Sequence, residues 1–244
     1  MTLTAHGLTV PAPTRTQAGA VTRLNIQEPA KTLQRMDRRH LESISVLILQ
    51  TKRFPFCDME SEPGFVWALI QSFSLANKGM FEEKMFGKDF PVNHTKNNVD
   101  WNSYRLSLTQ MESIANHSTH FRATCNFPTE GLQYTDYARA KLEGHDIFGG
   151  WNVQCRQYEY INIRGIECSN CTAGTKQKTN SAWSIKGYQS KRKWGCDFDG
   201  SPGAISNNER SFGFYGDGTV NADHRCSSSP TATTQHWFGA KHEW

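Results

Sequence analysis

The chain has 244 residues, of which 37% are hydrophobic and 20% are charged, so it can bury a sizeable core as a polar globular protein. Its mean hydropathy is −0.63, and it has no apolar run near the roughly 20 residues of a membrane helix, which argues against a membrane span. The formal net charge of +4 is concentrated in residues 1–56, which have eight basic and three acidic residues. Residues 57–244 have nineteen basic and twenty acidic residues. Because this main part of the chain is nearly neutral, a nucleic-acid partner is not expected.

Residues 1–42 are predicted to be a disordered or atypical N-terminal arm. Residues 1–27 are rich in Thr, Ala, Pro and Gly and lack the charged and then apolar stretches of a secretory signal peptide. Residues 28–43 have some helical spacing. They are either an oligomerising stem, which would make the protein a homo-oligomer, or an isolated and marginal helix.

Residues 43–244 are predicted to form one domain of short strands and helices. The composition typical of strands occurs at 43–50, 65–73, 121–127 and 157–163. A helix is predicted at 107–116, where Leu108, Met111 and Ile114 recur at helical spacing. The chain after residue 169 is rich in Gly, Ser, Asn and Thr, which indicates a loop-rich C-terminal subdomain.

Cysteines and glycosylation sequons indicate the compartment. Seven cysteines all lie after residue 56: Cys57, Cys125, Cys155, Cys168, Cys171, Cys196 and Cys226. Three N-glycosylation sequons begin at Asn93, Asn116 and Asn170. Together they favour an extracellular, secreted, disulfide-bonded glycoprotein, although no signal peptide is visible. The alternative is a cytosolic protein with scattered free thiols.

Four segments carry a resemblance to a known family: Phe54-Pro55-Phe56-Cys57-Asp58-Met59, Trp67-Ala68-Leu69-Ile70-Gln71, Trp101-Asn102-Ser103-Tyr104-Arg105 and Phe121-Arg122-Ala123-Thr124. They resemble the fibrinogen C-terminal-like domain, in a divergent form nearer to intelectin-type lectins or an invertebrate branch. The resemblance covers about residues 43–244 and implies an α+β fold with a mainly antiparallel central sheet. It departs from the family at Glu62-Pro63-Gly64, which replaces a triple glycine, and in having no cysteine after Cys226.

The resemblance implies a calcium site at Asp217, Asn221 and Asp223, where the family holds its ion and where three side-chain oxygens lie close together. Asp197 and Asp199 form a weaker candidate, because their Asp-x-Asp-Gly pattern is a fragment of a calcium loop. The alternative for both segments is that Asp and Gly only form turns.

The resemblance also places a ligand pocket beside the calcium segment, where Tyr215, His236, Trp237 and Phe238 are the candidate residues. Aromatic rings stack on the apolar faces of sugars, so these residues suit a sugar platform. The alternative is that each of them packs in the core. A separate basic stretch, Ser190-Lys191-Arg192-Lys193-Trp194 with Lys186 nearby, suits sulfated glycans or nucleic acid, with a solvated loop as the default interpretation.

Cys57 is expected to be unpaired. In the resembling family the cysteine at this position pairs with one upstream, and residues 1–56 contain no cysteine. The other six can then form up to three disulfides. Cys168 and Cys171 form a CxxC pair, which can instead indicate a redox or zinc site, but disulfide use is favoured because no βαβ pattern or second CxxC is present.

The expected function is calcium-assisted, non-catalytic recognition of glycans or acetylated groups on cell-surface glycoproteins, in innate recognition or adhesion. The chain lacks the G-x-S-x-G, H-E-x-x-H and Walker motifs of common enzymes. The alternatives are a matrix or adhesion protein that uses the domain for protein contacts and, from another class, a redox or metal protein that uses the CxxC pair.

Overall fold

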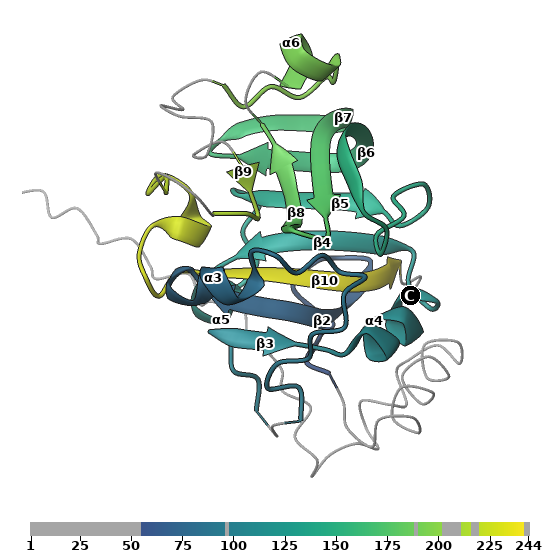
Figure 1. Ribbon diagram of the computed structural model, residues 1–244, viewed down its shortest axis with the longest axis vertical. Helices are drawn as coiled ribbons and strands as arrows, with labels where there is room; N and C mark the ends of the chain where they lie inside the picture. Colours follow the sequence, from purple (N-terminus) through teal and green to yellow (C-terminus); the bar gives the residue numbers. More distant parts are fainter. Residues whose placement is uncertain (1–54, 96–97, 188–189, 202–210, 216–219, 242–244) are drawn as a thin grey trace, which may run out of the picture.

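The computed structural model describes residues 55–95, 98–187, 190–201, 211–215 and 220–241 (Figure 1). The predicted arm at 1–42, the predicted strand at 43–50 and Asp217 lie outside these residues.

The described residues form one large antiparallel sheet (Figure 1). Its ten strands are β1 (Cys57–Asp58), β2 (Phe65–Ser74), β3 (Ser103–Arg105), β4 (His120–Cys125), β5 (Tyr137–Lys141), β6 (Trp151–Ile163), β7 (Ile166–Lys178), β8 (Ser181–Lys186), β9 (Ser211–Phe212) and β10 (Thr233–Lys241). The spatial order is β1-β2-β10-β4-β5-β6-β7-β8-β9, with β3 beside β2. The C-terminal strand β10 therefore lies in the middle, between β2 and β4.

The expectation of an α+β fold is wrong. Strands account for 41% of the described residues and helices for 16%, so the fold is dominated by its sheet. The main error lies after residue 169, where a loop-rich subdomain was expected and β7 to β10 are found. These strands contain many Ser, Thr and Gly residues, which normally indicate turns. Small polar side chains such as Thr175, Ser184 and Thr234 are nevertheless buried.

The helices are short. They are α3 (Lys78–Phe81), α4 (Leu108–Ala115), α5 (Phe127–Glu130) and α6 (Ser190–Trp194), with 3₁₀ turns η1 (Leu75–Asn77) and η3 (Arg225–Ser227). The predicted helix at 107–116 is confirmed as α4, which Ser107 and Gln110 start with a capping box. Among the described helices, none has the length and apolar character needed to cross a membrane.

The core lies mainly on the face of the sheet that carries Phe121 of β4 and His236 of β10. Strands β6 to β9 curl over this face, so that the Trp183 ring on β8 lies 5.0 Å from Phe121 and 5.5 Å from His236, measured between ring centroids. The opposite face of β2, β10 and β4 has a second, smaller cluster around Trp67 and Trp237, which are both buried. Apolar side chains thus cover both faces of the central strands, which excludes water from their backbone hydrogen bonds.

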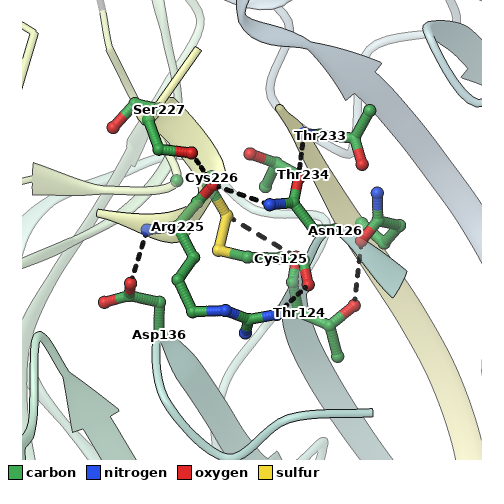
Figure 2. Close-up of a disulfide and its surroundings, with 12 residues drawn as sticks. Thr124, Cys125, Asn126, Asp136, Arg225, Cys226, Ser227, Thr233 and Thr234 are labelled. Atoms are coloured by element: carbon green, nitrogen blue, oxygen red, sulfur yellow. Dashed lines mark hydrogen bonds between the residues drawn. A yellow bond between two sulfur atoms is a disulfide. The ribbon is translucent and has the colours of Figure 1, made fainter. Parts of the chain in front are cut away.

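Three disulfides are present, and they are compatible with an extracellular protein. Cys125–Cys226 joins the end of β4 to η3 (Figure 2), Cys155–Cys196 joins β6 to the residues after α6, and Cys168–Cys171 closes a three-residue step within β7. Cys57 has a free thiol, and burial raises its pKa to about 12. Cys168 and Cys171 are therefore oxidised and joined to each other, which is the disulfide use favoured from the sequence over zinc ligation.

Candidate functional site

The described residues of the two predicted calcium segments make local hydrogen bonds. Asn221 Oδ1 accepts from the Asp223 backbone N–H at 2.8 Å, which closes a turn and leaves Asp223 exposed. Within the described ranges, no three His, Cys, Asp or Glu side chains are grouped so as to hold a metal ion. Because Asp217 lies outside these ranges, calcium binding by this segment stays a prediction.

The carboxylates of the weaker calcium candidate, Asp197 and Asp199, also accept local hydrogen bonds. Asp197 Oδ2 accepts from the backbone N–H and the hydroxyl of Thr172, at 2.9 and 2.8 Å. Asp199 Oδ1 accepts from the Ser201 backbone N–H at 3.0 Å. These bonds connect the chain after α6 to β7 and close a turn, so the turn-forming alternative describes the surroundings of both carboxylates.

The predicted ligand residues Tyr215, His236, Trp237 and Phe238 are all buried. Trp237 Nε1–H donates to Thr124 Oγ1 at 2.9 Å, as expected of an indole inside a core. Burial, with a smaller effect of Arg105, lowers the pKa of His236 to about 3. The core-packing alternative therefore describes their position, and these four rings offer no exposed platform.

Two of the three sequon asparagines are accessible. Asn116 follows α4 and Asn170 lies on β7, and both are exposed. Asn93 is half-buried, and its Nδ2 donates to the Ser103 carbonyl at 2.8 Å and to Asp100 Oδ2 at 3.2 Å. A glycan on Asn93 would replace one of these N–H groups, so Asn116 and Asn170 are the sites that the fold favours.

A dense polar group, here called the Glu62 cluster, is formed by side chains from β1, the β1–β2 turn, β4, β5 and β6. Its members are Asp58, Glu62, His120, Arg122, Tyr137, Arg139 and Glu159. No local sequence pattern indicates this cluster as a whole, because its members come from separate segments of the chain. It forms one continuous chain of ion pairs and hydrogen bonds from the core to the surface.

Glu62 is the centre of this cluster and is only 2% exposed. Its carboxylate accepts from Tyr137 O–H at 2.8 Å, from Arg122 Nη1 at 3.0 Å and from Arg139 Nη1. The tight turn that carries Glu62 closes with a bond from the Phe65 backbone N–H to the Glu62 carbonyl and has Gly64 at a φ of +78°, which favours glycine. The turn Glu62-Pro63-Gly64 therefore supplies the central carboxylate of the cluster.

Arg122 anchors the inner end of the cluster. Its guanidinium lies between the rings of Trp67 and Trp237, 4.6 Å from each centroid, and donates to Asp58 Oδ2 at 2.5 Å. Trp237 is its cross-strand neighbour on β10. Although burial raises the pKa of Asp58, the Arg122 charge and the Ser61 hydrogen bonds outweigh this and hold it below its usual value. The arginine charge is thus both paired and stacked, which is what a buried cation requires.

The outer end of the cluster reaches solvent. Arg139 Nε donates to Glu159 Oε2 at 2.9 Å, and these two side chains are 22% and 20% exposed. His120 Nε2 lies 3.3 Å from Glu159 Oε1. Burial lowers the pKa of His120 in spite of this carboxylate. The imidazole is therefore mainly neutral at pH 7, so Arg139 is the cation that keeps Glu159 ionised.

Three tyrosine rings border this outer end and are here called the tyrosine edge: Tyr134, Tyr137 and Tyr160. The Tyr134 ring is 45% exposed and lies edge-on to Tyr137 at 5.1 Å and to Tyr160 at 6.1 Å. Tyr160 O–H donates to Glu167 Oε2 at 2.9 Å and accepts from Asn162 Nδ2 at 3.3 Å. An exposed ring therefore rests on two rings whose hydroxyls are fixed by hydrogen bonds.

Arg225, two residues after the predicted calcium segment, is bonded directly to the tyrosine edge. The Arg225 backbone N–H donates to Asp136 Oδ2 at 2.7 Å (Figure 2), and Arg225 Nη1 donates to the Thr135 carbonyl at 2.8 Å. Thr135 and Asp136 are the two residues between Tyr134 and Tyr137. The Cys125–Cys226 disulfide fixes the next residue to β4, so η3 and the tyrosine edge form one unit.

This arrangement combines an exposed aromatic ring with charged groups of both signs beside strands β5 and β6. Such surfaces bind ring-shaped polar molecules, because the rings cover C–H faces while the carboxylate and guanidinium bind hydroxyl or amide groups. Comparison with known proteins finds no match: no protein-family model, no curated protein and no solved structure aligns with this chain.

Proposed function

We propose that the protein is a secreted, non-catalytic glycan-binding protein whose ligand site is the tyrosine edge together with Arg139 and Glu159. The observation that carries the proposal is the exposed Tyr134 ring, which rests on two fixed rings beside a solvent-reaching ion pair. A sugar ring stacks on such an aromatic face, and its hydroxyls bond to the charged groups.

The site is preorganised, which supports binding. Tyr137 bonds through its hydroxyl to the buried Glu62, and Tyr160 bonds to Glu167 and Asn162. Few side-chain rotations remain to be lost when a ligand binds, so less of the contact energy is used in ordering the site. An isolated exposed tyrosine on a loop would lack this advantage.

Calcium assistance, which the resemblance implies for residues 217–223, is part of the proposal. The bonds from Arg225 to Thr135 and Asp136 support it, because ordering of that segment by an ion would also order the backbone of the tyrosine edge. Calcium is then expected to raise glycan affinity without touching the sugar. This differs from a bridging calcium, which coordinates the ligand itself.

A glycan array followed by titration of the best ligand tests the proposal, with and without a calcium chelator. Tyr134→Ala should weaken binding at least tenfold and leave the thermal unfolding midpoint nearly unchanged. Met80→Ala is the matched control, because Met80 is equally exposed at 45% and lies on α3. Unchanged binding by Tyr134→Ala would refute the assigned site. A protein that binds no glycan would refute the function and favour the adhesion alternative.

A further inference from the structure

A row of polar side chains crosses the far end of the sheet, on the face opposite the main core. Lys176 on β7 lies directly opposite Ser184 on β8, and Lys186 lies opposite Ser211 on β9. Cross-strand partners and alternate residues share a face of a sheet, so these four side chains line one strip. We call this strip the lysine row.

Lys186 is largely buried without a carboxylate. Its Nζ donates to Ser211 Oγ at 2.7 Å and lies 5.4 Å from the centroid of the Phe214 ring. No Asp or Glu in the described ranges pairs with it within 4 Å. Burial and the nearby Lys176 lower the pKa of Lys186 to about 8. A cation in this setting is costly to the fold unless something neutralises it.

The row contains a second buried polar group, the hydroxyl of Ser184. Ser184 Oγ is inaccessible to solvent and makes no hydrogen bond among the residues that the structure describes. Ser184 lies between Lys176 and Lys186 on the same face. Among the described residues, Lys186 therefore has a hydroxyl partner but no carboxylate, and an oxyanion would supply the negative charge that its ammonium lacks.

The exposed surface around the lysine row is strongly basic. Helix α6 packs closely on Gly174 of β7: a Cβ atom added to this glycine would lie only 2.6 Å from Ser190 Oγ. The side chains of Lys191, Arg192 and Lys193 on α6 are exposed to solvent. Residues 172–201 contain six basic and two acidic residues, a charge of +4, whereas the other residues of 57–244 contain thirteen and eighteen, a charge of −5. Positive charge in residues 57–244 is thus concentrated in the segment that contains most of β7, β8 and α6. Figure 1 shows α6 beside the ends of β6 and β7.

We propose that the lysine row with α6 is a second binding site, which holds a sulfate ester of an acidic extracellular glycan. Lys186 and Lys176, which both reach solvent in part, bind the ester oxygens, and the exposed α6 cations attract neighbouring charges of the chain. A nucleic acid is the less favoured partner, because single-stranded nucleic acids stack successive bases on aromatic rings. Among the described residues, Trp194 is the one exposed large aromatic side chain on or near α6. The site does not depend on the proposed tyrosine-edge function: Glu167 and Lys176 are nine residues apart on β7, roughly 30 Å.

Isothermal titration with a sulfated heparin hexasaccharide, its fully desulfated form and a single-stranded oligonucleotide of equal charge tests the proposal. We expect the sulfated form alone to bind well, and Lys186→Gln to weaken it at least tenfold. Lys141→Gln, an exposed lysine on β5, is the control and should bind as the wild type does. Substitution of Lys191, Arg192 and Lys193 by Gln should lower affinity and flatten its salt dependence.

Two results would overturn the proposal. If Lys186→Gln binds the hexasaccharide as tightly as the wild type, the binding is only a diffuse attraction to the surface. If the oligonucleotide binds as tightly as the sulfated hexasaccharide, the site does not recognise sulfate esters. Misfolding does not explain a loss in Lys186→Gln if its unfolding midpoint equals or exceeds that of the wild type, as expected when an unneutralised charge is removed. Acetylation of the wild-type protein gives an independent readout. The hexasaccharide should slow acetylation of Lys186 and leave Lys141 unaffected, and equal protection of both lysines contradicts the site.

Discussion

Replacing Glu62 by Gln tests the Glu62 cluster directly. The substitution keeps the shape of the side chain but removes its charge and puts an N–H donor where arginines already donate. Glu62 accepts from Tyr137, Arg122 and Arg139, and a hydrogen bond to a charged group contributes about 1.5–3 kcal/mol. After the substitution, Arg122 is still paired with Asp58 and Arg139 with Glu159. The loss of stability is therefore smaller than the sum of the three bonds. Breaking one buried ion pair costs about 3–5 kcal/mol, and that is the expected decrease in the free energy of unfolding.

Urea unfolding with the disulfides intact measures this decrease. Tyr137→Phe removes only the hydroxyl that donates to Glu62 and should cost about 1–2 kcal/mol. In the Glu62→Gln background the same change should cost less, so the double-mutant cycle should show a coupling of about 1 kcal/mol. Glu112→Gln, an exposed position on α4, is the control and should stay within about 0.5 kcal/mol of the wild type. A loss below about 1 kcal/mol in Glu62→Gln, with no coupling, would show that the cluster is not the structural centre inferred here.

Three further changes have defined outcomes. Gly239→Ala should destabilise the protein by at least about 2 kcal/mol in urea unfolding, because the added Cβ would lie 2.4 Å from the Trp67 ring and 2.3 Å from a backbone carbonyl; a neutral result contradicts this packing. Lys186→Met should be more stable than the wild type at pH 7, by up to roughly 3 kcal/mol, because the folded-state pKa has dropped from 10.5 to about 8. Between pH 8 and 10.5 the unfolded wild type binds more protons, so its stability should rise with pH and the difference from the variant should shrink; a constant difference refutes the titration. Replacing Cys125 and Cys226 by Ala should cost about 2–5 kcal/mol by calorimetry, since this disulfide closes a 101-residue loop, and a loss under about 1 kcal/mol contradicts its structural role.

The strands that could be predicted from the sequence are those whose pattern is apolar. The segments at 65–73 and 157–163 lie within β2 and β6, and 121–127 overlaps β4. β7 and β8 were missed because a polar composition normally indicates exposure, whereas Thr175 and Ser184 are buried. The pairing of β10 with β2 could not be predicted, since it joins segments about 165 residues apart and no local pattern encodes that contact.

The candidate site was less predictable than the fold. Each carboxylate of the Glu62 cluster looks like an ordinary surface charge, and Glu62 itself precedes a Pro-Gly turn. One local signal was available: Arg122 lies between Phe121 and Ala123 in a predicted strand, and an arginine in an apolar strand implies a buried acidic partner. The aromatic residues chosen instead, Trp237 and Phe238, lie on the central strand β10, which is covered on both faces.

Asp136 explains how the surface site and the disulfide depend on each other. Its two carboxylate oxygens accept backbone N–H groups from Arg164, in the β6–β7 turn, and from Arg225, in η3. These donors come from segments that flank the tyrosine edge on both sides, and the residue has a φ of +52°, a conformation that Asp tolerates better than most residues. Burial raises the pKa of Asp136 against the two hydrogen bonds that favour its ionised form. Asp136 thus carries a buried charge next to Tyr137, and its partner Arg225 directly precedes Cys226, which the disulfide fixes to β4. We explain this costly charge by the need to fix the backbone between Tyr134 and Tyr137, and not by stability alone.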